Sequence, residues 1–213
     1  MAYAHATDTA RPTSFEAARP GPALAPEYVE PGRSADGYEP GDFLLVATKK
    51  FGGWLIRLGQ SLRIRGEDRQ YVKWTHAALL VDSAGTLIEA VGSGVREGSI
   101  TEYAGQEYLV VRIVASPENR AEIVDFARWA LGRRARYNRL ATVSMALSML
   151  TGSKLAFFID GRFVCSSLVA RALERSGRIF DRDPSHIAPA DLAKYYRAGS
   201  AEGTACDTVA MAA

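Results

Sequence analysis

The chain is poor in the residues that form disulfides and metal sites. Its 213 residues include two cysteines and three histidines. Two cysteines cannot build a disulfide framework, so the fold must depend on a hydrophobic core. The cysteines and histidines are scattered at spacings that do not suit a zinc site, and no glycine-rich phosphate loop precedes a Lys-Ser or Lys-Thr pair. We therefore expect neither a metal nor a cofactor.

The sequence predicts neither a secretory signal nor a membrane span. Residues 1–10 have no basic start and no apolar stretch. The most apolar window, residues 140–159, is interrupted by serine, threonine, glycine and lysine. The 26 Lys and Arg residues nearly balance the 24 Asp and Glu residues, which gives no reason to expect nucleic acid as a partner. We expect a cytoplasmic protein, or one delivered by a non-classical, phage-type route; the oligomeric state stays open.

Composition divides the chain into three parts. Residues 1–38 are rich in alanine, proline and charge, which predicts a disordered arm. Residues 39–198 contain the apolar segments, and a chain of this length with 47% hydrophobic residues fits one core. Residues 199–213 consist mostly of small residues and are expected to form a disordered tail. We therefore predict a single domain over residues 39–198.

The hydrophobic pattern within this domain predicts an α+β fold. Apolar runs of strand length predict the strands of an antiparallel sheet at residues 43–47, 71–81, 86–91 and 108–114. Apolar residues at helical spacing predict helices packed against that sheet at residues 117–132, 140–150, 165–177 and 189–196. A basic amphipathic stretch, residues 51–62, is expected to pack on the core as a surface helix, with membrane-surface binding as the alternative.

Cys165 is the candidate nucleophile. It begins the predicted helix 165–177, and the partial positive charge of a helix N-terminus stabilises a thiolate. The same position leaves the backbone N–H of Cys165 free to donate to an oxyanion that develops on an attacked carbonyl. The alternative is that Cys165 is a small buried residue without chemistry. Cys206, in the predicted tail, has no helix start or base nearby and is predicted to be inert.

A thiol nucleophile requires a base, and His76 is the candidate. If the turn at residues 82–85 is centred on its middle bond, His76 lies opposite Val91, and Glu89 shares the same face of the hairpin. A carboxylate in the apolar run 87–91 is costly unless it is paired. A Glu89–His76 pair would fix the imidazole and favour its protonated form.

The other two histidines are weaker candidates for the base. His5 lies in the predicted arm. His186 follows Cys165 in the chain and would be the base in an unpermuted order, but it lies in a predicted loop with no strand to aim it. It stays the alternative to His76.

The order of these residues resembles a known family. Residues 74–81, 88–90 and 163–169 are similar to the His strand, the Glu strand and the Cys helix of the circularly permuted NlpC-type papain-like proteins. They resemble the YiiX/YaeF-like branch, which is related to lecithin:retinol acyltransferase-like enzymes. The resemblance covers residues 40–196. It implies a permuted papain-like fold, with the nucleophile at a helix N-terminus, and a catalytic set of Cys165, His76 and Glu89.

The resemblance also implies a function. It indicates a cysteine peptidase or amidase that forms an acyl-enzyme, with peptides of cell-wall peptidoglycan as the leading substrate class. It places Tyr137 near the thiol as a substrate-binding residue, although Tyr137 could equally be a core-edge tyrosine. Relatives often have Ser-Glu or Ser-Gly where this chain has Ser166-Ser167, and this departure leaves the substrate open. A lipid deacylase or acyltransferase and a catalytically idle binding module stay alternatives.

Overall fold

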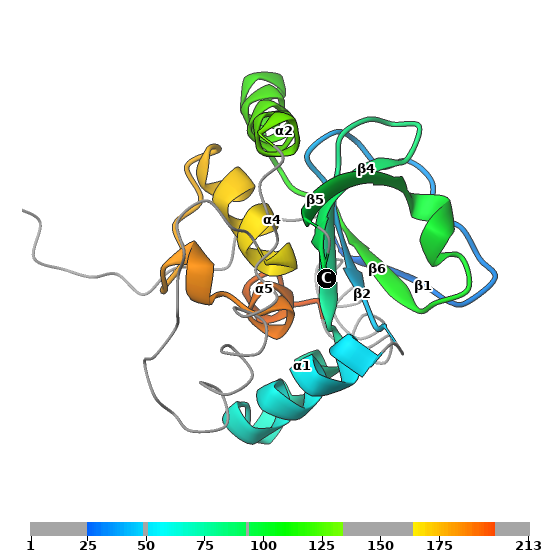
Figure 1. Ribbon diagram of the computed structural model, residues 1–213, viewed down its shortest axis with the longest axis vertical. Coiled ribbons are helices and arrows are strands. Elements are labelled where there is room, and N and C mark those ends of the chain that lie inside the picture. The colour runs from blue at the N-terminus through cyan, green and yellow to red at the C-terminus, as the bar shows by residue number, and fades with distance from the viewer. Residues whose placement is uncertain (1–24, 49–50, 93, 134–163, 199–213) are drawn as a thin grey trace, which may run out of the picture.

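The computed structural model describes residues 25–48, 51–92, 94–133 and 164–198. A sheet lies beside a group of helices (Figure 1). The strands are β1 (Glu27–Val29), β2 (Phe43–Val46), β3 (His76–Leu80), β4 (Thr86–Val91), β5 (Gly94–Ser99) and β6 (Tyr108–Val111). The helices are α1 (Phe51–Arg63), α2 (Pro117–Gly132), α4 (Cys165–Glu174) and α5 (Pro189–Tyr195), with 3-10 helices η1 (Gly66–Lys73), η2 (Ile100–Tyr103) and η3 (Pro184–His186). The predicted α+β class is confirmed.

The sheet has six strands in the order β1-β6-β2-β3-β4-β5, and every neighbouring pair is antiparallel. Strand β2 lies between β6 and β3, and each of its residues is buried. Because side chains alternate along a strand, Phe43 and Leu45 belong to the core on one face, whereas Leu44 and Val46 belong to the core on the other. A strand covered on both faces is a continuous apolar run, which is why the sequence predicts it.

The helices define the larger of the two cores. Helices α2, α4 and α5 lie on the same side of the sheet (Figure 1). Apolar side chains of these helices, such as Ile123, Leu168 and Leu192, pack with Leu45 and Leu79 of the sheet. The smaller core on the opposite face is covered by η2 and by the segment that follows β1. The sheet is therefore buried on both sides, and α4 packs against the face that the helices cover.

The structure differs from the predicted organisation at both edges of the sheet. Residues 27–29 lie in the predicted disordered arm, but they form β1, which pairs with β6, and Val29 is buried. The domain therefore begins before residue 39. Residues 94–99, predicted to be a connection, form β5 and pair with β4 along its whole length. Edge strands have a solvent-exposed side and need no regular apolar alternation, so the pattern does not reveal them.

The predicted strand 71–81 is shorter in the structure. Residues 66–73 form the 3-10 helix η1, and β3 begins at His76. The predicted helices at 117–132 and 189–196 are confirmed, and the helix that starts at Cys165 ends at Glu174. The predicted helix 140–150 and the predicted tail lie outside the described residues.

Candidate active site

The turn between β3 and β4 fixes how the two strands pair. The Oδ1 atom of Asp82 accepts hydrogen bonds from the backbone N–H groups of Ala84 and Thr86, both at 2.9 Å. Gly85 has a φ of +91°, a conformation that side chains rarely adopt, so glycine suits this position. These local contacts close the hairpin in one register.

The register brings His76 and Glu89 to one face of the hairpin. Leu80 pairs with Leu87 and Leu79 with Ile88, which is the predicted register. The side chains of His76 and Glu89 then meet: His76 Nε2 lies 2.6 Å from Glu89 Oε2. The His76 side chain is 14% exposed and that of Glu89 is fully buried. Hydrogen bonds between such groups are strong, because water does not screen them.

Cys165 lies at the first turn of α4. The first backbone hydrogen bond of this helix runs from Leu168 N–H to the Val164 carbonyl at 3.0 Å, so the preceding N–H groups have no acceptor within the helix. The hydroxyl of Ser167 donates to the same carbonyl at 2.9 Å, and Ser166 donates to Ile187 O at 2.6 Å, which ties the helix start to the segment before α5. Cys165 itself is 5% exposed.

The thiol of Cys165 and the imidazole of His76 lie close enough for each group to shift the pKa of the other. Burial raises the pKa of the Cys165 thiol, but the charge and hydrogen bond of His76 and the backbone N–H groups of Ala77 and Ser166 outweigh it, so the pKa lies below its usual value. Burial lowers the pKa of His76, but Cys165 and Glu89 together raise it from 6.5 to about 10. Both shifts favour a thiolate–imidazolium pair at neutral pH.

The two nitrogens of His76 have different partners. Glu89 occupies Nε2, so Nδ1 is the ring nitrogen left for the thiol. A carboxylate on one nitrogen fixes both the tautomer and the orientation of the ring. The arrangement is therefore a linear Cys165–His76–Glu89 series, which has the chemical requirements of a nucleophile, a base and an orienting acid.

Glu89 is held by two further residues, Tyr103 and Arg96. The Tyr103 hydroxyl donates to Oε2, the oxygen that also contacts His76. Arg96 Nη2 lies 2.6 Å from Oε1 in an ion pair that lacks hydrogen-bond geometry, and Oε1 has no hydrogen-bond partner among the described residues. Burial disfavours the Glu89 charge, but His76, Tyr103 and Arg96 together lower its pKa from 4.5 to about 2.

Tyr103 and Arg96 have further contacts that fix their positions beside Glu89. Burial, followed by the charge of Glu89, raises the pKa of Tyr103, so its hydroxyl stays a donor. The Tyr103 and His76 ring centroids are 6.0 Å apart. Arg96 also contacts Glu102 at 2.7 Å, and Glu102 and Ser99 form the capping box of η2. The segment from β5 to η2 therefore wraps around Glu89.

Sequence reasoning missed both Arg96 and Tyr103. Arg96 lies directly opposite Glu89 in the β4–β5 register, a cross-strand pair of opposite charge. A hairpin around Gly92 and Gly94 would reveal this pair, but the sequence pattern predicts a connection there. Tyr103 carried no sequence signal, because η2 brings it to Glu89 through tertiary packing.

The other candidate residues do not join this site. His186 is exposed at the end of η3 and contacts Ser185, and it is His76 whose pKa is shifted by the thiol. Tyr137 and Cys206 lie outside the described residues, so the predicted substrate-binding role of Tyr137 stays a prediction. Within the described ranges, no group of three or more His, Cys, Asp or Glu side chains is placed to hold a metal ion.

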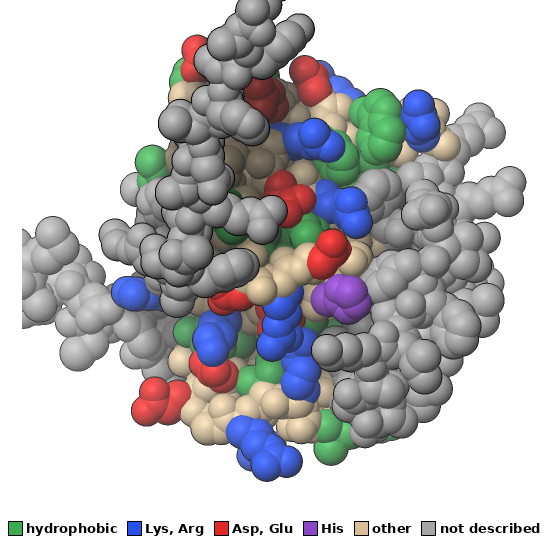
Figure 2. Space-filling view, turned by 90° about the vertical axis from the view of Figure 1, so that its left-hand side faces the viewer, with side chains coloured by type: hydrophobic (Ala, Val, Ile, Leu, Met, Phe, Trp, Pro, Cys, Tyr) green, Lys and Arg blue, Asp and Glu red, His purple; other side chains and the backbone are tan. Residues whose placement is uncertain are grey.

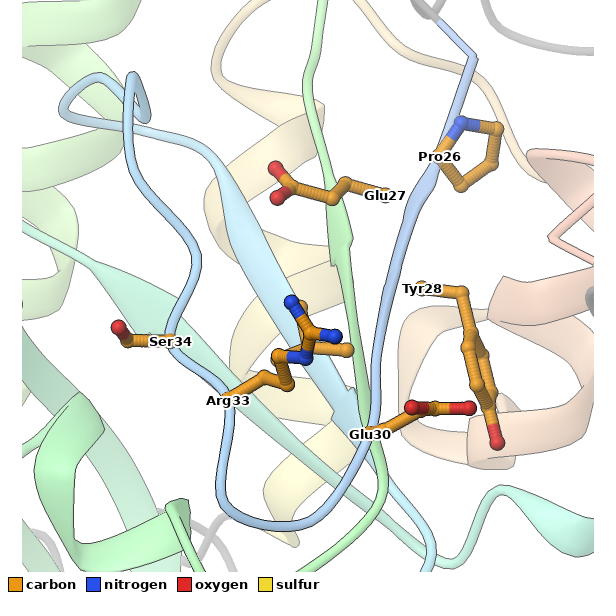
Figure 3. Close-up of a pocket in the computed structure, with 7 residues that line it drawn as sticks. Pro26, Glu27, Tyr28, Glu30, Arg33 and Ser34 are labelled. Carbon is orange, nitrogen blue, oxygen red and sulfur yellow. The ribbon is translucent and has the colours of Figure 1, made fainter.

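A surface hollow of about 520 Å³ lies away from these residues. Figure 3 shows it along β1 and the loop that follows, where Glu27, Tyr28, Glu30 and Arg33 surround it. None of its lining residues belongs to the Cys165 site.

Figure 2 shows the side of the molecule that bears α4 and α5, where on the described surface Lys and Arg side chains alternate with Asp and Glu. This mixture agrees with the net charge of +2.

Comparisons with known proteins leave the family undetermined. No protein-family model matches the chain, and no curated protein is significantly similar to it. The permuted papain-like fold therefore stays a prediction from the motif. Among the helices that the structure describes, none is long and apolar enough to cross a membrane.

Proposed function

We propose that this protein is a cysteine hydrolase of the permuted papain-like type that acts through an acyl-enzyme. The observation that carries the proposal is the buried Cys165–His76–Glu89 series at the N-terminus of a helix. A buried histidine bound to both a thiol and a carboxylate is not needed for packing, because isosteric apolar residues would fill the space without desolvating charges. Strongly shifted pKa values of this kind gather at functional sites.

The first half-reaction forms a thioester. The Cys165 thiolate attacks the substrate carbonyl carbon, a carbon–sulfur bond forms, and the carbonyl electrons move to oxygen. The backbone N–H of Cys165, which has no acceptor within the helix, can donate to this oxyanion. The His76 imidazolium gives its proton to the leaving nitrogen or oxygen, the bond to that atom breaks, and the neutral amine or alcohol departs.

The second half-reaction restores the enzyme. Neutral His76 takes a proton from water, and the hydroxide attacks the thioester carbonyl. The carbon–sulfur bond then breaks, the thiolate returns and the acid product leaves. Glu89 remains ionised throughout, because its pKa of about 2 lies far below neutral pH, and it orients the imidazole in both states.

The substrate class proposed from the family resemblance is a peptide amide, with peptidoglycan peptides as the leading example. A fold and a thiol site do not by themselves choose a substrate. An acyl ester of a lipid is the second candidate, and the observation that favours it is the exposed apolar side of α1, where Trp54, Leu58 and Leu62 are 55%, 39% and 48% exposed.

The proposal is tested by trapping the acyl-enzyme. The full chain is mixed with peptidoglycan peptides or with short acyl esters, quenched in acid, and analysed by intact-protein and peptide mass spectrometry. We expect an acyl adduct on Cys165 in the parent and in a Cys206→Ser control, and none in Cys165→Ala. Equal product formation by the parent and Cys165→Ala would refute thiol catalysis, and a site inert toward both substrate classes would favour a binding module.

A further inference from the structure

Helix α1 packs on the domain through its polar and small residues. Gly53 lies so close to Thr75 that an added Cβ would come within 3.1 Å of its hydroxyl. Gln60 is fully buried: its Nε2 donates to Val72 O at 3.1 Å and Trp74 O at 3.0 Å, and its Oε1 accepts from Ala190 N–H at 3.0 Å. The side of α1 that faces the protein is therefore fixed by hydrogen bonds and close backbone contact.

Three apolar side chains of α1 lie on its exposed side. Trp54, Leu58 and Leu62 are 55%, 39% and 48% exposed. Their spacing of four residues places them in one row along the helix. A surface helix ordinarily buries its apolar face, and Leu55 and Ile56 of α1 are half-buried, so this row is the exposed part of the helix's apolar surface. Contiguous exposed apolar side chains of this kind mark an interaction surface.

The charge around this row has one sign. Residues 51–65 contain three arginines, Arg57, Arg63 and Arg65, and no Asp or Glu. Arg63 forms an ion pair with Asp191, whereas Arg57 and Arg65 are exposed. Two lysines precede the helix in the sequence. Among the acidic residues near the helix, Asp68 contacts Lys194 at 2.7 Å and Glu107 contacts Lys73 at 2.5 Å. Glu107 also interacts with the charge of Arg57, and Glu67 is exposed.

We propose that α1 docks the domain on an anionic lipid bilayer, with the row of Trp54, Leu58 and Leu62 inserted among the headgroups. An exposed tryptophan and two leucines supply the apolar part, and tryptophan favours the boundary between headgroups and acyl chains. Arg57 and Arg65 supply attraction to anionic headgroups, and no acid within the helix opposes it. A single row on one helix suits the flat surface of a bilayer.

Docking would place the bilayer across α1 from the strand that carries His76. Gly53 of α1 contacts Thr75, which directly precedes His76. The bound bilayer and the strand that carries His76 would therefore lie on opposite sides of one helix. The inference concerns binding alone and does not depend on the proposed thiol chemistry.

The test is flotation of the full chain with vesicles of phosphatidylcholine alone or mixed with phosphatidylglycerol. We expect binding to the anionic vesicles that weakens with salt. Replacing Arg57 and Arg65 by glutamine should weaken binding about five-fold for each arginine. The double variant Leu58→Ser, Leu62→Ser should weaken it by more than about ten-fold. Ile179→Ser, at a residue 76% exposed on another part of the surface, is the matched control and should leave binding unchanged.

Tryptophan fluorescence locates the contact. In a Trp129→Phe background, Trp54 is the exposed tryptophan and Trp74 is fully buried, so a blue shift on anionic vesicles reports Trp54. Absence of binding, binding equal on neutral vesicles, or an unshifted emission would overturn the proposal. So would a dimer in sedimentation velocity that Leu58→Ser, Leu62→Ser dissociates, because a second copy would then cover the row. Cys165→Ala should bind vesicles like the parent, which separates this result from any failure of the hydrolase proposal.

Discussion

Replacing Glu89 by glutamine should slow the reaction of Cys165 with a small alkylating reagent. The substitution removes the charge that lies 2.6 Å from His76 Nε2 in a buried setting. It also leaves a single acceptor oxygen for two donors, His76 and Tyr103, and can turn an amide N–H toward Arg96. The imidazolium is then less stable, so the thiolate at Cys165 is less populated.

The size of the effect follows from the contact that is lost. A hydrogen bond to a charged group contributes about 1.5–3 kcal/mol, which corresponds to about a ten- to hundred-fold change in an equilibrium. We therefore expect alkylation of Cys165 by iodoacetamide to slow by about that factor at a pH below the ordinary thiol pKa of about 8.5. Peptide mass spectrometry measures Cys165 and Cys206 separately in the same sample.

A second carboxylate on the same hairpin provides the control. Asp82 stabilises the β3–β4 turn through hydrogen bonds to backbone N–H groups and is not part of the Cys165 site. Asp82→Asn tests whether loosening the hairpin is enough to slow alkylation, and we expect little change. The reasoning is refuted if Glu89→Gln alkylates at the parental rate across the pH range, or if Asp82→Asn slows the reaction equally.

Four further predictions test individual contacts. Tyr103→Phe removes one of the two hydrogen bonds to Glu89 Oε2 and should slow Cys165 alkylation less than Glu89→Gln does; equal slowing would contradict a supporting role. The Glu89 pKa is lowered from 4.5 to about 2, so its stabilisation is present above the higher value and lost as the pH falls toward the lower. In urea unfolding the parent should lose about 3 kcal/mol from this group over that acid range, and Glu89→Gln should lack that loss. The His76 pKa of about 10 predicts that acyl-enzyme formation declines as the pH rises through that value, because the imidazolium no longer protonates the leaving group; a decline near pH 6.5 would show an unperturbed histidine. Gly85→Ala places a Cβ 2.6 Å from Ile100 Cγ2 at a φ of +91°, and should lower the free energy of unfolding by about 1–3 kcal/mol in urea titration.

The central part of the fold could be predicted from the sequence, because its signals are local. The run at residues 43–46 has no polar interruption, and the turn at residues 82–85 sets the register that joins His76 to Glu89. The same register argument paired His76 with Glu89, whereas Cys165 was identified by its position at the start of a predicted helix. Helix α2 follows from Pro117 at its start and from the apolar spacing of its buried residues.

The edges of the sheet could not be predicted in this way. Strand β1 has three residues between Pro26 and Pro31, too few to show a period. Strand β5 contains Arg96 and Glu97 at its centre and glycines at residues 94 and 98, so it looks like a loop. The sequence pattern therefore gives no sign of Arg96 as a site residue, although its charge is what the buried Glu89 requires. Tyr103 reaches the site through a 3-10 helix whose position depends on the finished sheet.

The most direct test of the proposed site is a titration of the Cys165 thiolate by its far-ultraviolet absorbance. The Cys165→Ser protein is subtracted from the parent, so that Cys206, present in both, cancels. A thiolate paired with His76 predicts a midpoint well below the ordinary thiol pKa of about 8.5, and a return toward that value in His76→Ala. A midpoint at or above the ordinary value in the parent, unchanged by His76→Ala, would contradict the ion pair and, with it, the proposed hydrolase.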